Sequence, residues 1–263
     1  NLQQIPSRDP EIKKMIRGLF IPEDGEQWGS FDYSSQEPRL LVHYCSVVNQ
    51  GSEILNDIVE KYQTEDVDFH QMMADMANIT RKEAKTVNLG IMYGMGKQKL
   101  ADTLDIKLDD ANELLQTYHR KVPFVKELAD RVMNKAQKHG KIRTVLGRMC
   151  RFDMWEPKTF GYNQPMKRED AEKEYGPGIR RAFTYKALNR LIQGSAADQT
   201  KKAMVDCFKE GLVPLLTVHD ELCFSVSSQK QADKITEIME QGLPLKIPSK
   251  VDQELGKDWG EVG

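Results

Sequence analysis

Two acidic sites, far apart in the sequence, have the residue types needed to hold divalent cations. Asp32 follows the strand-like run 28–31, and the pair Asp220-Glu221 follows the apolar run 215–218. The two aspartates are 188 positions apart, so only the fold can bring them together. Carboxylates that converge from separate strands suit phosphoryl transfer, because two cations about 3.5–4 Å apart stabilise both the attacking and the leaving oxygens. Such a site favours two Mg²⁺ ions, with Mn²⁺ as a substitute.

Each acidic site taken alone also has an ordinary explanation. Asp and Glu near the ends of strands are often turn residues or solvated charges. Short motifs give many false matches, so the surrounding residues must decide.

A helix-like segment between the acidic sites has cations at one-turn spacing. Four residues of the segment 81–94 follow i, i+4 spacing and so share a helical face: Arg81, Lys85, Leu89 and Tyr93. Thr80 and Glu83 form a capping box that predicts the start of this helix. Arg binds phosphate in a bidentate manner and Lys binds it as a point charge, so the face suits a triphosphate. A solvated basic face is the alternative, and the apolar and aromatic members of the stripe argue against it.

Four segments, in this order, resemble the signature motifs of the DNA polymerase I family (family A), particularly of its phage-type members. The segment 28–41 resembles motif A, the segment 81–94 resembles motif B, and His219-Asp220-Glu221 resembles motif C; the segment 189–198 is the fourth. The resemblance covers nearly the whole chain. It implies a template-directed, DNA-dependent DNA polymerase of DNA replication or repair, a nucleotidyltransferase that joins a dNTP to a primer 3′-hydroxyl by a two-metal mechanism.

The resemblance assigns roles at the metals and at the nucleotide. Asp32 and Asp220 are the expected catalytic metal ligands, the backbone carbonyl of Tyr33 adds a third ligand, and Glu221 is a further catalytic candidate, as a ligand through water. Six residues are expected to contact the nucleotide: Arg81, Lys85, Leu89, Tyr93, His70 and Glu37. Among these, His70 resembles a residue that contacts the β-phosphate, and Glu37 resembles the residue that excludes a ribose 2′-hydroxyl. Leu89 departs from the family, which usually has Phe or Tyr there, and it lacks their flat ring face.

Five further residues are expected to contact primer-template DNA: Asn189, Gln193, His219, Arg148 and Arg151. The amides of the first two suit minor-groove acceptors that every base pair presents. By resemblance His219 is expected near the primer terminus. On its chemistry alone it could equally be a histidine packed in the core. Tyr185 stands where family members often have Arg, which removes one expected DNA contact.

The residues named above require a small sheet and several helices to position them. The pattern predicts an α+β fold, with a small antiparallel sheet interrupted by a long helical insertion. We predict a strand over 27–33, a hairpin over 213–226 with His219-Asp220 at its tip, and helices over 37–48 and about 179–210. Residues 1–26 are expected to be irregular and residues 153–180 to form a surface loop.

The resemblance also implies a domain organisation. It predicts a right-hand polymerase fold whose palm is built from residues 1–45 and 186–263, with fingers from 46–185 and no thumb. In this family the thumb, and often a 3′–5′ exonuclease domain, precede this region. A catalytic fragment, or one product of a longer precursor, is therefore expected.

Charge and composition fit a nucleic-acid enzyme without requiring one. The net charge is −2, but residues 81–151 contain 16 Lys and Arg against 8 Asp and Glu, so this part is basic and the remainder acidic. A basic middle suits phosphate binding and acidic flanks suit cations, although ordinary charged helices are equally consistent.

The four cysteines lack C-x₂-C spacing, which argues against zinc and for reduced structural thiols. No apolar run approaches the ~18 residues of a membrane span and no export signal is visible, so we expect no membrane partner. The expected location is the cytoplasm of a bacterial or phage-infected cell, or an organelle.

Two alternative functions remain at this point. A single-subunit RNA polymerase shares the two-aspartate chemistry, and Glu37 together with His219-Asp220-Glu221 argues for DNA instead. A non-catalytic DNA-binding fragment is the other alternative, and the presence of both Asp32 and Asp220 argues against it.

Overall fold

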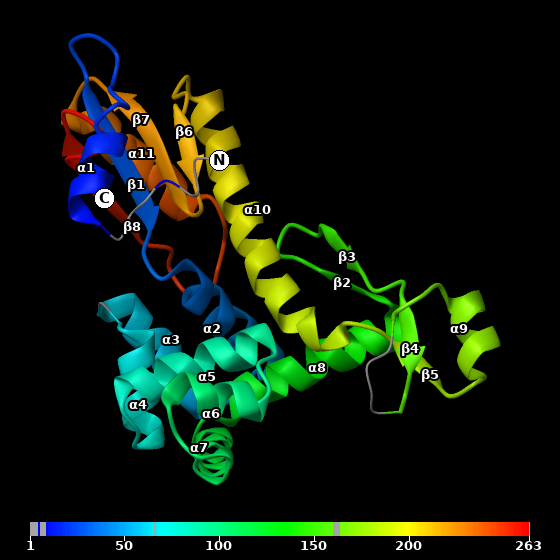
Figure 1. Ribbon diagram of the computed structural model, residues 1–263. Helices are drawn as coiled ribbons and strands as arrows, with labels where there is room; N and C mark the ends of the chain where they lie inside the picture. Colours follow the sequence, from blue (N-terminus) through cyan, green and yellow to red (C-terminus); the bar gives the residue numbers. More distant parts are fainter. Residues whose placement is uncertain (1–4, 6–8, 66, 160–163, 263) are drawn as a thin grey trace. The chain divides into compact units, whose positions relative to one another are not determined.

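The chain combines helices with small antiparallel sheets, which confirms the predicted α+β class (Figure 1). The computed structural model describes residues 5, 9–65, 67–159 and 164–262. Its elements, in chain order, are α1 (Pro10–Arg17), β1 (Gln27–Tyr33), α2 (Gln36–Val48), α3 (Glu53–Thr64), α4 (Phe69–Ala77), α5 (Arg81–Tyr93), α6 (Lys97–Leu104), α7 (Leu108–Lys121), α8 (Pro123–His139), β2 (Lys141–Arg143), β3 (Met149–Arg151), β4 (Trp155–Pro157), α9 (Arg168–Tyr175), β5 (Ile179–Arg181), a 3₁₀ turn (Thr184–Lys186), α10 (Ala187–Lys209), β6 (Leu216–Val218), β7 (Glu221–Val226), α11 (Gln229–Gln241) and β8 (Val251–Gly256).

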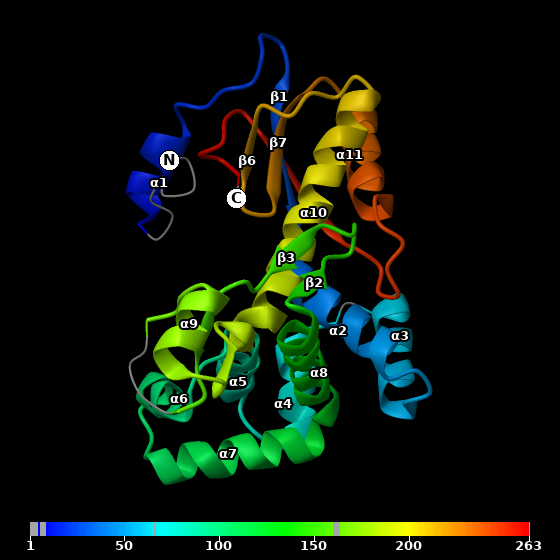
Figure 2. The same ribbon diagram turned by 90° about the vertical axis from the view of Figure 1, so that its right-hand side faces the viewer.

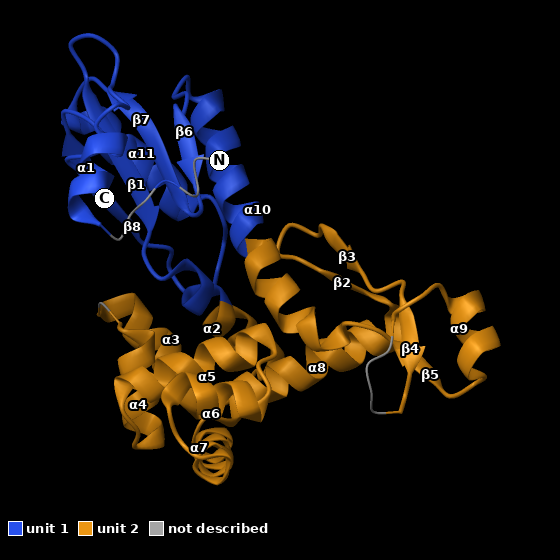
Figure 3. Cartoon of the chain, in the orientation of Figure 1, with its two compact units in different colours: residues 1–40, 196–263 blue, residues 41–195 orange. Residues whose placement is uncertain are grey.

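The chain divides into two compact units (Figure 3). Unit 1 contains residues 1–40 and 196–263, and unit 2 contains residues 41–195. Unit 1 is therefore built from both ends of the chain, and unit 2 from its middle. Within the described part of the chain, none of the helices is both long enough and apolar enough to cross a membrane.

Unit 1 is built on a four-stranded antiparallel sheet in the order β6-β7-β1-β8. The strand predicted over 27–33 and the hairpin predicted within 213–226 are confirmed as β1 and β6-β7. Alternate side chains of a strand face opposite sides of the sheet. One face buries Phe31, Tyr33 and Phe224 against residues of α10 and α11, including Cys207 and Ile235, in a continuous apolar core.

The other face of the sheet is only partly covered by apolar residues. Trp28 and Cys223 lie there with Trp259 and Val262 of the C-terminal segment. The Trp28 and Trp259 rings stack with their centroids 6.3 Å apart, and Phe20 meets Trp259 edge-on at 5.4 Å. This small cluster covers one end of the face, and the strand positions beyond it, Ser30 and Asp32, are left for polar groups.

Unit 2 is mainly helical, and its helices α4 to α8 can be followed in Figure 2. The predicted capping box is present at the start of α5, because Thr80 and Glu83 bond reciprocally. Pro123 occupies the first turn of α8, where its missing N–H costs no helical hydrogen bond. After α8, the strands β2 and β3 form an antiparallel pair in which Lys141 lies opposite Arg151.

Three predicted segments were wrong. Residues 1–26 contain α1, which begins where Asp9 caps the chain and Pro10 takes the first helical position. Residues 153–180 contain α9, β4 and β5, although 160–163 lie outside the described residues. The helix predicted from about 179 begins only at Ala187, because 179–181 pair with β4 as a strand. Strands of three residues, and a helix that buries Ala171 among mostly charged residues, have too few apolar positions to show a periodicity.

Candidate active site

Three carboxylates form a row across the sheet of unit 1. Asp32 of β1 lies directly opposite Glu221 of β7 on one side and opposite Asp252 of β8 on the other. Directly opposed residues of an antiparallel pair point to the same face, with Cβ atoms about 4.5–5.5 Å apart. Asp220 adds a fourth carboxylate from the two-residue turn between β6 and β7. The two acidic sites found in the sequence are therefore neighbours in this sheet.

The pKa values of both aspartates are raised, chiefly by burial and also by neighbouring carboxylates. The pKa of Asp32 is raised to about 7, first by loss of surrounding water and then by the charges of Asp220, Glu221 and Asp252. Only the backbone N–H of Tyr33 acts in the opposite direction. The pKa of Asp220 is also raised, first by burial and also by the charge of Glu221, although its own backbone N–H and His219 lower it. Such a set of carboxylates concentrates negative charge on one face of the sheet.

Glu221 differs from the two aspartates because it is buried and firmly held. Its Oε1 accepts hydrogen bonds from the Ser30 hydroxyl and from Trp259 Nε1 at 3.1 Å, and a weaker one from Cys223 Sγ at 3.3 Å. A buried carboxylate with several donors is a structural anchor between the sheet and the C-terminal segment. All three hydrogen bonds use Oε1, so this oxygen is already occupied by protein donors.

The acidic row forms one wall of an open pocket of about 390 Å³ within unit 1. Lys13 and Arg17, one turn apart on α1, line the same pocket. Arg17 also lies over the Trp259 ring, 4.3 Å from its centroid. The sequence prediction did not identify α1, and so it missed these two cations beside the acids.

The carboxylates fit a hard divalent cation such as Mg²⁺, which takes oxygen ligands. Across the described residues, no three His, Cys, Asp or Glu side chains are arranged to hold a metal by themselves. Mg²⁺ in proteins usually binds one or two carboxylates together with waters and substrate phosphates. Tyr33 has its side chain on the opposite face, where its hydroxyl donates to the Met239 carbonyl at 2.8 Å, so only its backbone carbonyl is a candidate ligand.

The cationic stripe of α5 lies on the surface of unit 2. Arg81 and Lys85 are exposed, Leu89 is half-buried, and Tyr93 is 44% exposed. The opposite side of the helix is buried through Ala84, Val87 and Met92, among others. The stripe is thus a continuous accessible face of the kind expected for a triphosphate.

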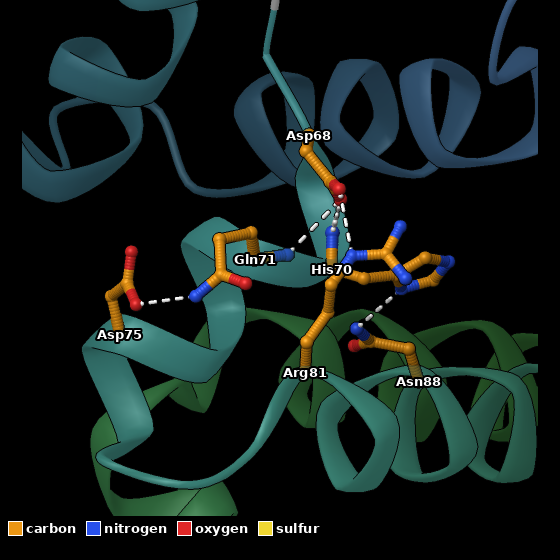
Figure 4. Close-up of polar contacts among 6 residues, drawn as sticks. All are labelled: Asp68, His70, Gln71, Asp75, Arg81 and Asn88. Atoms are coloured by element: carbon orange, nitrogen blue, oxygen red, sulfur yellow. Dashed lines mark hydrogen bonds and ion pairs between the residues drawn. The ribbon is translucent and has the colours of Figure 1, made fainter.

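Asp68 joins Arg81 to the beginning of α4, as Figure 4 shows. Its Oδ2 accepts from Arg81 Nε at 2.8 Å, while its Oδ1 caps α4 by accepting the N–H groups of His70 and Gln71 at 3.0 and 3.1 Å. Burial alone would raise the pKa of Asp68, but the hydrogen bond from Arg81 and those from the backbone lower it overall. Two residues expected at the nucleotide, His70 and Arg81, are therefore brought together by one carboxylate.

Tyr93 and Gln193 connect the far end of this stripe to α10. Gln193 Nε2 donates to the Tyr93 hydroxyl at 3.2 Å. Gly94 has a φ of +66° and contacts Tyr185 so closely that an added Cβ would lie 3.0 Å from its ring. Residues expected at the nucleotide and at DNA thus meet within unit 2.

The remaining expected DNA residues have varied surroundings. Arg148 donates from Nη2 to the Gly194 carbonyl at 2.7 Å, and Arg151 is exposed on β3. Asn189 is half-buried, and its Nδ2 has no hydrogen-bond partner among the described residues. In unit 1, His219 is exposed in the β6-β7 turn with a φ of +55°, a left-handed conformation that is uncommon for residues other than glycine.

Glu37 lies half-buried in the first turn of α2 in unit 1. Nearby, the buried Arg39 donates to the carbonyls of Ser34 and Pro248 at 2.9 and 2.8 Å. This arginine joins the turn before α2 to the segment that precedes β8.

Sequence reasoning missed several residues that the structure places at these sites. Asp252 belongs to the acidic row, but nothing in its neighbourhood marks it apart from a short alternation in 251–256. Asp68 precedes α4 as an N-cap, a signal that was present in the sequence. Asn88 was part of the motif B segment but received no role.

Comparison with known proteins gives a consistent family. The family model described as "DNA polymerase family A" matches residues 1–261. A DNA-directed DNA polymerase of Pseudomonas phage M6 is 40% identical over 300 residues, which cover 99% of this chain and 42% of that protein. DNA polymerase I of Geobacillus stearothermophilus is 33% identical over 270 residues, which cover 98% of this chain and 29% of that protein.

A solved structure is also similar over almost the whole chain. It is the POL domain of Pol1 from M. smegmatis in complex with DNA primer-template and dNTP, with 30% identity and a TM-score of 0.75. The match covers 99% of this chain and 44% of that one, so the chain spans less than half the length of these relatives. The chain belongs to DNA polymerase family A.

Proposed function

We propose that this chain carries the nucleotidyl-transfer centre of a template-directed DNA polymerase. The observation that supports this most directly is the convergence of Asp32 and Asp220 in one sheet, with the pKa of both raised and that of Asp32 raised in part by the charge of Asp220. Family membership and the names of the phage and bacterial relatives support the same activity. The reaction joins a dNTP to the 3′-hydroxyl of a primer and releases pyrophosphate.

Asp32 and Asp220 are the proposed ligands of two Mg²⁺ ions, with the Tyr33 carbonyl as an additional ligand. Mg²⁺ at this position supplies positive charge that stabilises the attacking and the leaving oxygens. Glu221 contributes by holding Trp259 and Ser30 beside the row, and any link to a cation through water would use its second oxygen. Mn²⁺ has compatible oxygen chemistry and is the proposed substitute.

The chain's own cations and amides bind the substrates in this proposal. The solved relative was determined with DNA primer-template and dNTP, which supports the same two ligands here. Arg81, Lys85 and His70 hold the triphosphate, while Leu89 and Tyr93 border the sugar and base. Five residues contact primer-template DNA: Asn189, Gln193, His219, Arg148 and Arg151.

In this proposal residues 1–45 and 186–263 form the palm, which includes the whole of unit 1, and residues 46–185, all within unit 2, form the fingers. The relatives are more than twice as long as the matched region, which supports further domains of the same polypeptide, namely the expected thumb and an exonuclease domain. The phage and bacterial sources of the relatives support action in the cytoplasm of a bacterial or phage-infected cell.

Primer extension by alanine variants tests the metal assignment. Asp32→Ala and Asp220→Ala should each abolish extension but leave primer-template affinity within about twofold, because these groups hold cations rather than DNA. Asp233→Ala, which removes an exposed carboxylate of α11, is the matched control and should extend normally. Mn²⁺ binding, followed by calorimetry, provides a second measurement that requires no turnover. Substantial extension by either active-site variant removes the assignment.

Sugar selection separates a DNA polymerase from a single-subunit RNA polymerase. Wild-type chain should incorporate deoxyribonucleotides in preference to ribonucleotides, and Glu37→Ala should raise the ribonucleotide share by opening space beside the sugar C2′. Single-nucleotide kinetics measure the ratio. An unchanged ratio in the variant excludes Glu37 as the selective residue.

A further inference from the structure

Asn88 of α5 lies fully buried between a histidine and a tyrosine of unit 2. Its Nδ2 lies 3.2 Å from His70 Nδ1, and its Oδ1 accepts a hydrogen bond from the hydroxyl of Tyr118, which is also fully buried. Figure 4 shows the Asn88 side chain reaching the His70 ring from below α4. Three residues from α4, α5 and α7 thus form one chain of hydrogen bonds.

The chemistry of these groups determines where the His70 proton lies. An amide nitrogen can only donate, so the ring nitrogen that faces it, Nδ1, must accept. A neutral imidazole whose Nδ1 accepts carries its proton on Nε2. A rotation of the Asn88 amide by half a turn would exchange its oxygen and nitrogen and place the nitrogen against the Tyr118 hydroxyl. The hydroxyl would then lose the acceptor of its hydrogen bond, so this rotation is unfavourable.

The electrostatic surroundings keep both partners in the required protonation state. Burial raises the pKa of Tyr118, so its hydroxyl stays protonated and donates. The pKa of His70 is lowered, first by burial and then by Lys85 and Arg81, and Asp68 opposes this only in part. The ring is therefore neutral at neutral pH.

We propose that Asn88 is a positioning residue that fixes His70 as the Nε2–H tautomer, and that Tyr118 in turn fixes the orientation of Asn88. The Nε2–H group is then the hydrogen-bond donor offered to a phosphate oxygen of the incoming nucleotide. The identity of this ligand rests on the function proposed above, whereas the tautomer does not. A phosphate oxygen only accepts, so the opposite tautomer would turn a lone pair toward it.

His119 provides an internal comparison on the same chain. It is half-buried and has a lowered pKa, as His70 has, mainly because of burial. Its Nδ1 is buried but has no hydrogen-bond partner among the residues that the structure describes. No amide therefore selects its tautomer, and it should not respond to changes at Asn88.

Nitrogen NMR of histidine-labelled protein tests the inference, because the ring ¹⁵N shifts report which nitrogen carries the proton. In the wild-type chain His70 should show a protonated Nε2 and an unprotonated Nδ1. Proton on Nδ1 overturns the proposal, and this measurement requires no substitution.

Two substitutions then test the cause. Asn88→Asp keeps the size of the side chain but replaces the donor with a carboxylate acceptor, so His70 Nδ1 should become protonated while the His119 shifts stay unchanged. A His70 Nδ1 that stays unprotonated in this variant overturns the role of Asn88. Tyr118→Phe removes the hydroxyl that orients the amide, so both tautomers of His70 should become populated. A single wild-type pattern in this variant removes Tyr118 from the proposal.

Titration with inorganic tripolyphosphate separates the tautomer from the proposed function. The His70 Nε2 signal should shift to saturation while the His119 signals stay in place, and His70→Gln should weaken binding by several-fold. A correct tautomer without any response to tripolyphosphate removes the phosphate role, and with it the proposed place of His70 at the nucleotide. A wrong tautomer with a normal response overturns only the inference about Asn88.

Discussion

The acidic row of unit 1 and the α4-α5 junction of unit 2 treat the charge of a carboxylate in opposite ways. Asp32 lies among like charges, and its pKa is raised to about 7. Asp68 has its charge satisfied by Arg81 and by backbone N–H groups, and its pKa is lowered. One region holds like charges side by side, and the other pairs its carboxylate directly with an arginine before any ligand arrives.

This difference follows from what each region is proposed to bind. A bound cation removes the repulsion between carboxylates, so the row gains stability only when the metal is present. A triphosphate needs cations and donors held in fixed directions. Asp68 binds Arg81 Nε, and because the guanidinium group is planar, this hydrogen bond also fixes the direction of its two outer nitrogens. The first region should therefore respond strongly to metal, and the second should not.

Mg²⁺ should produce the largest contrast between the two regions. It should raise the free energy of unfolding of the wild-type chain by about 2.7 kcal/mol at one hundred times its dissociation constant. Asp32→Asn should lose most of this response and be slightly more stable in EDTA, because opposed like charges destabilise a strand pair by about 0.2–1 kcal/mol. Asp68→Asn, in the other region, should keep the full metal response. Thermal unfolding in EDTA and in Mg²⁺ measures both effects, and an equal metal response in Asp32→Asn contradicts the comparison.

Within unit 1, Glu221 and Asp220 should have different effects on the free energy of unfolding when each is replaced by alanine. Glu221→Ala leaves Trp259 Nε1 and the Ser30 hydroxyl without their acceptor, at a cost of about 1–3 kcal/mol. Asp220→Ala removes a repelled charge and should leave stability unchanged or slightly higher in EDTA. Glu221→Gln keeps an acceptor oxygen and serves as the control. Chemical denaturation decides, and equal losses for the two alanine variants would show that neighbouring carboxylates do not differ in this way.

Asp68 should show a smaller effect that divides into two parts. Asp68→Asn keeps a capping oxygen and loses only an exposed ion pair, which contributes about 0–1 kcal/mol. Asp68→Ala also loses the cap of α4 and should cost about 0.5–2 kcal/mol. The control is Asp75→Ala, which removes another carboxylate of α4, one that accepts from Gln71 at 2.7 Å. Amide hydrogen exchange at His70 and Gln71 should quicken in Asp68→Ala only; faster exchange in the Asp75 variant as well would assign the effect to the helix surface in general.

The elements that carry Asp32 and Asp220 could be predicted from the sequence because their signals are local. A short apolar alternation predicts β1, and a turn between two apolar runs predicts the β6-β7 hairpin. The capping box likewise fixes where α5 begins. Each of these depends on residues within a few positions of one another.

The partners of these residues could not be predicted, because they come from distant parts of the chain. Asp252 joins the acidic row only through the register of β8 on β1. Tyr118 reaches Asn88 across 30 positions, and Trp259 reaches Glu221 across 38. The cations of α1 were missed for a different reason: Asp9-Pro10 was a visible start signal, and the prolines and glycine around it suggested irregular chain instead. Local sequence patterns therefore identify the site residues but not the residues that contact them from distant parts of the chain.

Leu89 provides the smallest expected effect and tests whether the α5 face contacts a ligand at all. The side chain is half-buried between exposed Lys85 and exposed Tyr93, so a larger ring can extend toward solvent. Leu89→Tyr should therefore change stability by no more than about 0.5 kcal/mol, the range of a surface substitution. If a nucleotide lies on this face, the ring should tighten dNTP binding. Its hydroxyl should also raise acceptance of dideoxynucleotides by about one hydrogen bond, roughly 0.5–1.5 kcal/mol or up to about tenfold in selectivity.

Leu89→Phe is the matched control, since it adds the ring without the hydroxyl and should tighten binding without changing dideoxy selectivity. A loss of about 1–3 kcal/mol in both variants, with unchanged selectivity, would instead show an overpacked core position. In that case Leu89 belongs to the interior of unit 2, and the nucleotide-binding part of the α5 face ends at Lys85.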